Sequence, residues 1–301
     1  MPAQTIAFIT PSYERDLERC RLLCESMDDM AQGNWQHYIL VADHDAPLFK
    51  PLTGPRRHII PDSVLLPAWL KPVRRPFDKH RRWMWVSRSI NHMVWPMSGW
   101  HVQQLRKMLI ARHIDEASLV MTDSDSVFMR PFGNDVFFHD SALRLYAKVD
   151  GITKLPGLEK HVQWVAQAQK ILGLPPVILP APDYISNLVS WRREHALAML
   201  EHIEAVNGRE LVAAMGRSRT FSEYQIYGAF AEQRLHGRGH FLDKRSLTLT
   251  YWTGDMLTEQ TLEDFIDTLS DRQIAIGIQS FIGLPAEMLR RSYRARAARL
   301  R

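Results

Sequence analysis

Short apolar segments alternate with amphipathic helical segments over the first 125 residues of this 301-residue chain. Strand-like segments occupy residues 4–13, where Pro11 ends the strand, and residues 37–43, 57–61 and 118–125. Residues 17–30, which Asp16 is placed to cap, and residues 100–115 carry apolar side chains at helical spacing. Strands that alternate with helices are typical of a mostly parallel sheet with helices on both faces, so the sequence predicts an α/β fold.

The composition is typical of a soluble protein, with 46% hydrophobic and 24% charged residues. No apolar stretch approaches the roughly 18 residues of a membrane-spanning helix, and the N-terminal residues lack the basic lead of a secretory signal. Cys20 and Cys24 are interpreted as core thiols of a reducing compartment, with a metal site or a disulfide as alternatives. We therefore expect a cytoplasmic protein.

The net charge of +5 comes from the C-terminal end of the chain. Six of the 38 basic residues are arginines within residues 290–301, and the other 32 are balanced by 33 acidic residues. A nucleic-acid enzyme would more often carry its charge across a folded face, so no nucleic-acid partner is expected. Residues 286–301 form a predicted basic helix, either peripheral on an anionic membrane at its inner face or frayed and solvated. Its apolar face comprises Met288, Leu289, Tyr293, Ala297 and Leu300.

Residues 65–98 have no clear periodicity and are rich in Arg, Pro and Trp, so we expect a loop. Its Trp residues either pack on the sheet while the basic side chains stay in water, or contact a phosphate-bearing substrate or lipid. The basic residues in question are Lys71, Arg74, Arg75, Lys79, Arg81, Arg82 and Arg88, with Asp78 as the one acid between Lys71 and Arg82. Further along, strands are predicted at 183–191 and 246–252 and helices at 193–206 and 220–235, before residues 258–269 and 273–281 complete the body.

Two aspartates one residue apart, Asp123 and Asp125, end the buried run "LVMTDSDSVFM". Alternate residues of an extended chain point the same way, so both carboxylates face one space and repel unless a proton or a cation intervenes. Three interpretations are open: a turn whose carboxylates cap backbone amides, a haloacid-dehalogenase-type phosphatase with Asp123 as nucleophile and Asp125 as acid, or a divalent-cation site. The pair lies at the carboxyl end of a strand in the Rossmann-like N-terminal half of the chain. This position favours a cation that binds the diphosphate of a nucleotide.

The ordered blocks "TPSYERD", "GWHVQQLRKM", "LVMTDSDSVFMRPF" and "TFSEYQIYGAF" resemble a GT-A-fold glycosyltransferase. More narrowly, the chain resembles a bacterial group of glycosyltransferase-like proteins of the DUF6492 type over most of residues 5–285. The resemblance implies a single GT-A-like catalytic domain over residues 1–285, followed by the basic tail, 286–301. Residues 1–125 would form the nucleotide-sugar-binding half and residues 126–285 the acceptor half.

The resemblance also implies a metal-dependent transfer of a sugar from a nucleoside-diphosphate sugar, with Mn²⁺ or Mg²⁺. Asp125 would be the direct metal ligand, and Asp123 would hold ribose or a metal-bound water. The donor would contact Pro11, Ser12 and Tyr13 beneath the nucleotide, Asp43 at the base or ribose, and Gln103, Gln104 and Lys107 on the helix. Many relatives add a His ligand near the end of the fold, where "TLTYWTGD" has none and His240 and Asp255 are weak substitutes.

An inverting transfer needs a base to accept the proton of the acceptor hydroxyl. Glu223 is the first candidate, because the resembled family places an acid at a helix start beneath the acceptor. Thr220 with Glu223, or Ser222 with Gln225, also has the spacing of a capping box. Asp183 is the second candidate, with a turn role as the alternative, and in a retaining enzyme Glu223 would instead bind the acceptor.

The function predicted from the sequence is glycosyl transfer to a saccharide or glycolipid acceptor, by analogy with a bacterial surface polymer. The opposing enzyme interpretation is the phosphatase with a covalent phospho-Asp123. The non-enzyme interpretation is a GT-A-like binding protein without turnover.

Overall fold

A mixed α/β fold surrounds one central sheet in the computed structural model, which describes residues 5–75 and 82–300. The sheet has the order β13-β7-β1-β2-β3, with β13 antiparallel to β7 and the other pairs parallel. These strands span Val189–Arg192, Ser118–Met121, Ile6–Pro11, Trp35–Val41 and Arg57–Pro61. The parallel sheet predicted from the first 125 residues is therefore confirmed, and the GT-A arrangement of the whole chain stays a prediction.

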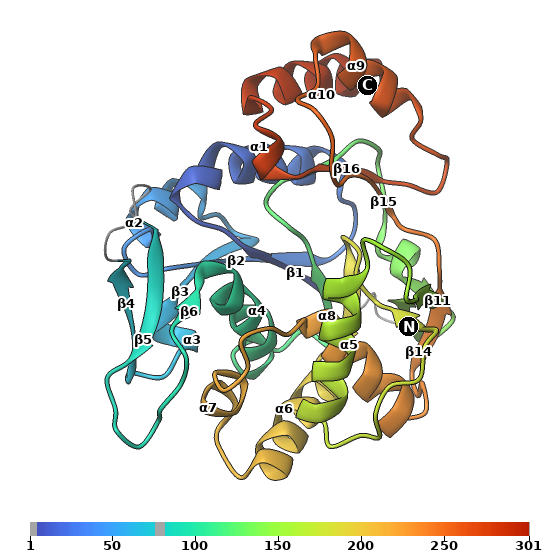
Figure 1. Ribbon diagram of the computed structural model, residues 1–301. Helices are drawn as coiled ribbons and strands as arrows, with labels where there is room; N and C mark the ends of the chain where they lie inside the picture. The colour runs from blue at the N-terminus through green and yellow to red at the C-terminus, as the bar shows by residue number, and fades with distance from the viewer. Residues whose placement is uncertain (1–4, 76–81, 301) are drawn as a thin grey trace.

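Helices α1 (Leu17–Met30) and α4 (Gly99–Leu109) cover opposite faces of β1 (Figure 1). Ile6 and Phe8 pack in one core with α1, while Ala7 and Ile9 pack in the other with α4. This alternation follows from the two-residue period of a strand, and all six residues of β1 are buried because both of its faces are covered. Asp16 occupies the N-cap position of α1 but makes no side-chain capping bond, contrary to its predicted role.

The segment expected as a loop, residues 65–98, contains a three-stranded antiparallel sheet, so that prediction is wrong. The sheet has the order β4-β5-β6, with bounds Leu70–Arg74, Trp83–Ser87 and Met97–Ser98. Pro72 lies within β4, where a proline is tolerated because β4 is an edge strand. Trp85 is buried, and its indole N–H donates to Asp62 at 3.2 Å, which ties the small sheet to the core.

Three further small sheets form after residue 125. The first contains β8 (Ser126–Phe128), β16 (Ala275–Ile278) and β15 (Thr248–Tyr251). The second contains β9 (Phe138–His139), β10 (Ala142–Tyr146) and β14 (His240–Asp243). The third pairs β11 (Lys148–Ile152) with β12 (Ala181–Asp183). The strand predicted over 183–191 is divided, because the chain leaves β12 at Asp183 and reaches β13 only after Leu188, which has a positive φ of 56°.

The helices of this half are α5 (Glu159–Ile171), α6 (Arg193–Asn207), α7 (Leu211–Met215), α8 (Glu223–Ala229), α9 (Glu259–Asp267) and α10 (Ala286–Leu300). The earlier short helices are α2 (Ala46–Phe49) and α3 (Asp62–Leu65). Single turns lie at Glu14–Asp16, Lys50–Leu52, Ile110–Arg112, Asn134–Phe137 and Ser280–Ile282, and a π-helical turn, Phe230–Arg234, extends α8. None of the described helices is both long and apolar enough to cross a membrane.

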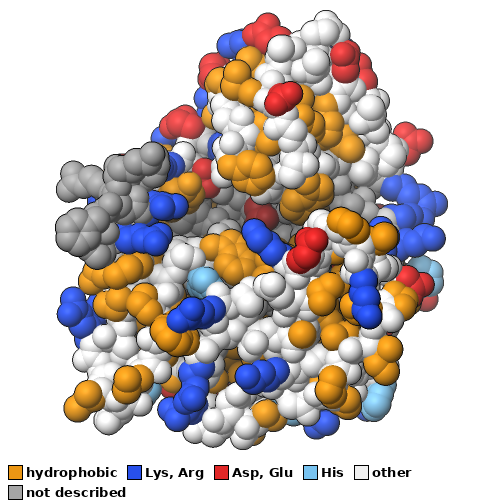
Figure 2. All heavy atoms as spheres, in the orientation of Figure 1, with side chains coloured by type: hydrophobic (Ala, Val, Ile, Leu, Met, Phe, Trp, Pro, Cys, Tyr) orange, Lys and Arg blue, Asp and Glu red, His pale blue; other side chains and the backbone are white. Residues whose placement is uncertain are grey.

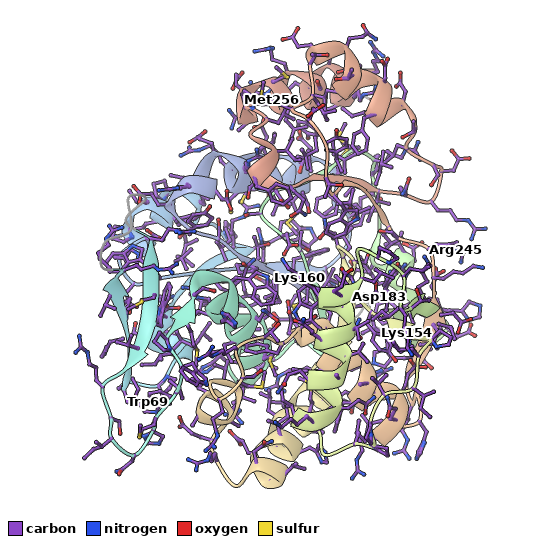
Figure 3. All side chains as sticks on the ribbon, in the orientation of Figure 1. Trp69, Lys154, Lys160, Asp183, Arg245 and Met256 are labelled. Carbon is purple, nitrogen blue, oxygen red and sulfur yellow. The ribbon has the colours of Figure 1, made fainter. Side chains whose placement is uncertain are left out.

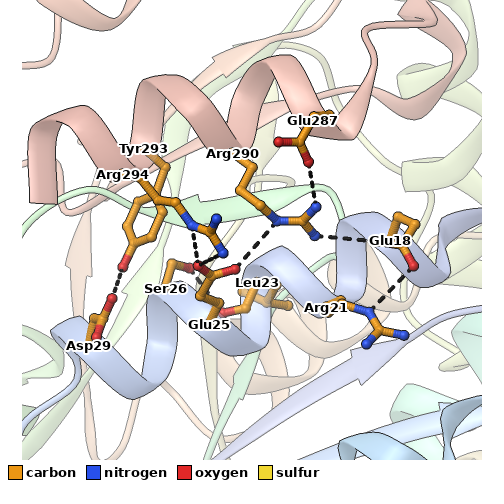
Figure 4. Close-up of polar contacts among 10 residues, drawn as sticks. All are labelled: Glu18, Arg21, Leu23, Glu25, Ser26, Asp29, Glu287, Arg290, Tyr293 and Arg294. Carbon is orange, nitrogen blue, oxygen red and sulfur yellow. Dashed lines mark hydrogen bonds and ion pairs between the residues drawn. The ribbon is translucent and has the colours of Figure 1, made fainter.

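The C-terminal helix α10 packs along α1, so the expectation of a frayed, solvated helix is wrong (Figure 4). Leu289, Tyr293 and Ala297 are buried in the α1-side core, and the Tyr293 hydroxyl donates to Asp29 at 2.6 Å. The predicted apolar face is thus confirmed for these residues, and it contacts protein. The arginines beside it pair with carboxylates: Arg290 with Glu18, Glu25 and Glu287, Arg291 with Glu259, Arg294 with Glu25, and Arg296 with Glu263 and Asp267.

Candidate functional site

A cleft of about 1030 Å³ lies at the carboxyl ends of β1 and β7. Pro11 at the end of β1, residues 12–16 after it and residues 123–125 after β7 form its floor. Residues of α4 and α8 form one wall. Figure 2 shows a hollow in the middle of this face, with acidic and basic side chains close together in and beside it. Open α/β sheets commonly bind ligands at this edge, because the loops that follow parallel strands converge there.

A buried lysine holds two acidic side chains in the cleft. Nζ of Lys107 lies 3.0 Å from Asp123, 3.2 Å from Glu223 and 2.8 Å from the hydroxyl of Tyr224. Burial acts to lower the pKa of Lys107, but Asp123, Tyr224 and Glu223 outweigh that effect and raise it well above its ordinary value. Lys107 therefore remains a cation and fixes the positions of both carboxylates.

Of Asp123 and Asp125, Asp125 is the more deeply buried, with 8% of its surface exposed. Its Oδ1 has no hydrogen-bond partner among the described residues. Burial raises its pKa to about 7, with further contributions from Asp123 and Asp16 and an opposing one from Arg19. An unpaired buried carboxylate oxygen is costly, so it marks a place where a cation or a proton belongs.

The turn interpretation of the aspartate pair explains only one of these contacts, the hydrogen bond from the backbone of Ser280 to Asp125. The turn is closed by the backbone, since the amide of Ser126 donates to the carbonyl of Asp123 at 3.1 Å. The Asp123 carboxylate instead contacts Lys107, and one Asp125 oxygen stays without a partner.

A third acid, Asp16, joins the cleft floor. Burial raises its pKa to about 6, while Arg19 and the Ser124 hydroxyl oppose the shift and Asp123 adds to it. Sequence reasoning assigned Asp16 to helix capping, because an Asp before a helix usually has that role. The available signal was its position in the loop after the first strand, at the same sheet edge as Asp123.

Asn187 contributes a second unsatisfied polar group to the cleft lining. It is almost fully buried, and neither its amide nitrogen nor its amide oxygen has a hydrogen-bond partner among the described residues. Buried amides are normally paired, so this side chain is available to a polar ligand. It was missed in the sequence because residues 183–191 were predicted to form one continuous strand.

The donor set fits a hard divalent cation in part. Asp125 offers an unpaired oxygen, and Asp16 and Asp123 are close enough to shift its pKa. Carboxylate oxygens are the ligands that Mg²⁺ and Mn²⁺ prefer, and such ions commonly keep open positions for substrate phosphate. Within residues 5–75 and 82–300, no group of three acidic, His or Cys side chains is already assembled to hold a metal.

Most of the predicted site residues line this cleft. They are Pro11, Ser12, Tyr13, Gln103, Gln104, Lys107, Asp123, Asp125 and Glu223. Asp43 is not part of the lining, and Asp45 lines the cleft instead. The Asp43 carboxylate accepts the backbone amide of Ser63 at 3.0 Å. His240 and Asp255, the substitute metal ligands, are likewise outside the lining.

Asp183 also lies outside the cleft lining, contrary to its predicted role near the acceptor. It accepts hydrogen bonds from Gln225 and from the backbone amide of Ile185, each at 3.0 Å, and contacts His161 at 3.1 Å. Figure 3 places it beside α5. Asp183 therefore links α5 and α8, which is the turn-like structural role left open by the sequence.

Glu223 is the first residue of α8 and does not form the predicted capping box with Thr220, whereas the N-cap half of the alternative pair, Ser222 with Gln225, is present. Ser222 is the N-cap and accepts from the amide of Gln225 at 3.4 Å, while Thr220 accepts from the indole of Trp164. The backbone amide of Glu223 donates to Gln104 at 3.0 Å, which fixes the start of α8 against α4. Burial raises the pKa of Glu223, and Lys107 opposes that shift.

The opposite wall of the cleft is basic and aromatic. Arg74, Arg75 and Arg82 belong to it, and Trp83 is stacked on His44 at 4.1 Å and covered by the Arg74 guanidinium at 3.9 Å. Lys79, Arg81 and Asp78, which the sequence placed in the same basic stretch, lie outside the described residues. Trp85 is buried, so the packing interpretation is confirmed for that side chain. Trp83 and Trp85 both line the cleft, and contact with a phosphate-bearing substrate or lipid stays a prediction.

Together these observations define an α/β protein with a polar cleft at the carboxyl edge of a mostly parallel sheet. The chain belongs to the DUF6492 family, a family of unknown function, whose model matches residues 4–288. No curated protein matches the chain.

Proposed function

We propose that this protein is a metal-dependent glycosyltransferase with a GT-A-like fold. It moves a sugar from a nucleoside-diphosphate sugar to a saccharide or glycolipid acceptor. The observation that carries the proposal is the buried, unpaired carboxylate oxygen of Asp125 beside Asp123, in a large cleft at the carboxyl end of a parallel strand. A diphosphate bridged to this floor by a cation would satisfy the carboxylates and occupy the cleft.

In this proposal Asp125 and Asp123 hold Mn²⁺ or Mg²⁺, with Asp16 on the same floor. The bound ion would supply Lewis-acid neutralisation of the diphosphate leaving group. Lys107 orients Asp123 and Glu223 through its ion pairs and adds positive charge near the donor. The half-exposed ring of Tyr13, which follows β1 in the cleft, provides a stacking surface for the nucleoside.

Glu223 is the proposed base for an inverting transfer. Its carboxylate lines the cleft, and Lys107 and Gln104 hold it and its backbone in place. In that role it accepts the proton of the acceptor hydroxyl as the new glycosidic bond forms and the nucleoside diphosphate leaves. Asp183 is not proposed for this role, because it lies outside the cleft lining.

Calorimetric titration with UDP, GDP and CDP, each with and without Mn²⁺, tests the proposal. We expect one nucleoside diphosphate to bind only with Mn²⁺, and we expect Asp125→Asn to abolish that binding. The melting temperature of the Asp125→Asn variant should equal that of the wild type or be higher. The rise is expected because the substitution removes a buried charge beside two like charges. Nucleotide-independent phosphate release with a covalent phospho-Asp123 would instead assign the phosphatase. Binding without turnover of any matching nucleotide sugar would assign the binding protein.

A further inference from the structure

Residues 88–96, which connect β5 to β6, present large apolar side chains to solvent. Ile90 is 92% exposed, Met93 80% and Trp95 50%. The loop lies at the foot of the β4-β5-β6 sheet, at the lower left of Figure 1. A cluster of exposed apolar side chains in one short loop is unusual for the surface of a soluble monomer and marks an interaction site.

This loop has a defined conformation because it is tied to its neighbours. The His92 ring stacks on Trp69 at 4.8 Å, and Ser89 Oγ contacts Nδ1 of the same histidine at 3.1 Å. The backbone amide of Trp95 donates to the carbonyl of Gly216 at 2.9 Å. Trp69 is labelled in Figure 3 near the foot of the small sheet. The contacts use the polar and aromatic side of the loop, so Ile90 and Met93 are left facing water.

The surface around these side chains is basic. The charged residues of the loop and of the adjacent segment 210–219 are Arg88, Arg217 and Arg219, all exposed, and one acid, Glu210, which accepts from the Trp69 indole at 2.8 Å. The Arg219 guanidinium lies 3.9 Å from the centre of the Trp95 ring. In Figure 2 hydrophobic and basic side chains lie together at the lower left, where Figure 1 places this loop.

We propose that this surface, residues 88–96 with Arg217 and Arg219, docks onto an anionic lipid bilayer. Ile90 and Met93 would enter the boundary between headgroups and acyl chains, Trp95 would lie at headgroup level, and the arginines would meet lipid phosphates. The charge decides between occupants, because two copies of a surface with three arginines and one carboxylate would repel each other. The helix α10 is a weaker candidate, because four of its arginines already pair with carboxylates.

Docking there would also orient the cleft. Pro96, the last residue of the loop, and Ser98 in β6 line the cleft. His101 in the same lining contacts the carbonyl of Arg219 at 2.8 Å. A bilayer against the loop would therefore lie beside the cleft mouth. If the proposed function holds, the acceptor is lipid-anchored; this consequence rests on that function, whereas the docking itself does not.

Cosedimentation of the full chain with vesicles tests the docking. The vesicles contain phosphatidylcholine alone or phosphatidylcholine with phosphatidylglycerol, at low and at physiological salt. We expect binding to the anionic vesicles that weakens with salt. Ile90→Asp with Met93→Asp should lower the partition coefficient by about tenfold or more, since each side chain loses its burial in the bilayer. Arg88→Gln with Arg217→Gln should lower it by a similar factor through lost headgroup attraction.

The matched control is Leu155→Asp with Ile178→Asp, two strongly exposed apolar side chains in other loops, which should leave the partition coefficient unchanged. Melting temperatures of all variants verify folding. The proposal is overturned if the wild-type chain does not bind anionic vesicles, or if the loop and control variants behave alike. It is also overturned if light scattering shows a dimer that the loop variant dissociates while vesicle binding is unaffected. Nucleotide titration of the loop variant tests the proposed function separately, because loss of vesicle binding with unchanged nucleotide binding concerns only the docking surface.

Discussion

At the residue scale, Lys107 is the side chain on which the cleft depends most. It is buried and forms ion pairs with both Asp123 and Glu223. Lys107→Met would leave two carboxylates facing each other without a cation. Removing one member of a buried ion pair is destabilising because the other charge stays buried without a partner. We expect a loss of about 3 kcal/mol in the free energy of unfolding, measured by urea denaturation. Lys170→Met, at an exposed lysine of α5, is the matched control and should change it little.

The two sequence-predicted bases are separated by a pair of isosteric substitutions. Glu223→Gln should lower the rate of transfer by about 10²- to 10⁴-fold, because the proposed proton acceptor is removed. Asp183→Asn should lower stability, through its contacts with Gln225 and His161, and leave the transfer rate within a few-fold of wild type. Equal losses of transfer rate in the two variants would contradict the assignment of Glu223.

How far the site was predictable from the sequence depends on the residue. Asp123 and Asp125 follow from a local pattern, a strand end, whereas Lys107 follows only from the resemblance to GT-A-fold glycosyltransferases. The structure brings all three to one cleft. Asp183 and Asp43 have similar local patterns, but their carboxylates are occupied by groups distant in sequence, Gln225 and Ser63. A single sequence does not contain that information, so the two kinds of aspartate look alike.

At the element scale, α10 is part of the folded body. Leu289→Ala removes a buried side chain from the interface of α10 with the α1-side core and should cost about 2–4 kcal/mol of the free energy of unfolding. Arg299→Ala, at an exposed position of the same helix, should leave it nearly unchanged. Chemical denaturation of both variants is the measurement. If Leu289→Ala is as stable as Arg299→Ala, α10 does not pack as described.

The helix was predictable as a helix, and its apolar face was predictable by its spacing. Its partner was not, because the carboxylates that pair with Arg290, Arg294 and Arg296 belong to α1, α9 and the start of α10 itself. The β4-β5-β6 sheet was missed for a different reason. Pro72 in β4 weakens the local strand signal, and the pairing of β4 with β5 is not visible in a single sequence.

At the scale of the whole molecule, stability should depend on acid pH through the partly buried His240. Nδ1 of His240 donates to the carbonyl of Leu143, and Nε2 lies 2.9 Å from the Tyr227 hydroxyl. Burial lowers the pKa of His240 to about 4, against an ordinary value of 6.5. The unfolded chain therefore binds this proton below about pH 6.5 and the folded chain only below about pH 4, so stability falls as the pH drops between them.

We expect this histidine to contribute a loss of about 1–3 kcal/mol between pH 6.5 and pH 4. His240→Asn keeps a donor for Leu143 but does not titrate. It should be less stable than wild type at pH 7, and its stability should fall less steeply over this interval. Urea denaturation at a series of pH values gives both slopes, and parallel slopes would show that His240 is not the group responsible.

The acidic floor at the carboxyl ends of β1 and β7 is the proposed metal site. The most direct test is a crystal structure of the protein with Mn²⁺ and the nucleoside diphosphate that binds in titration, with anomalous scattering used to locate the metal. We expect a manganese peak within ligand distance of both Asp125 and the diphosphate in the cleft. A nucleotide bound elsewhere, or diphosphate in the cleft with no metal at Asp125, would contradict it.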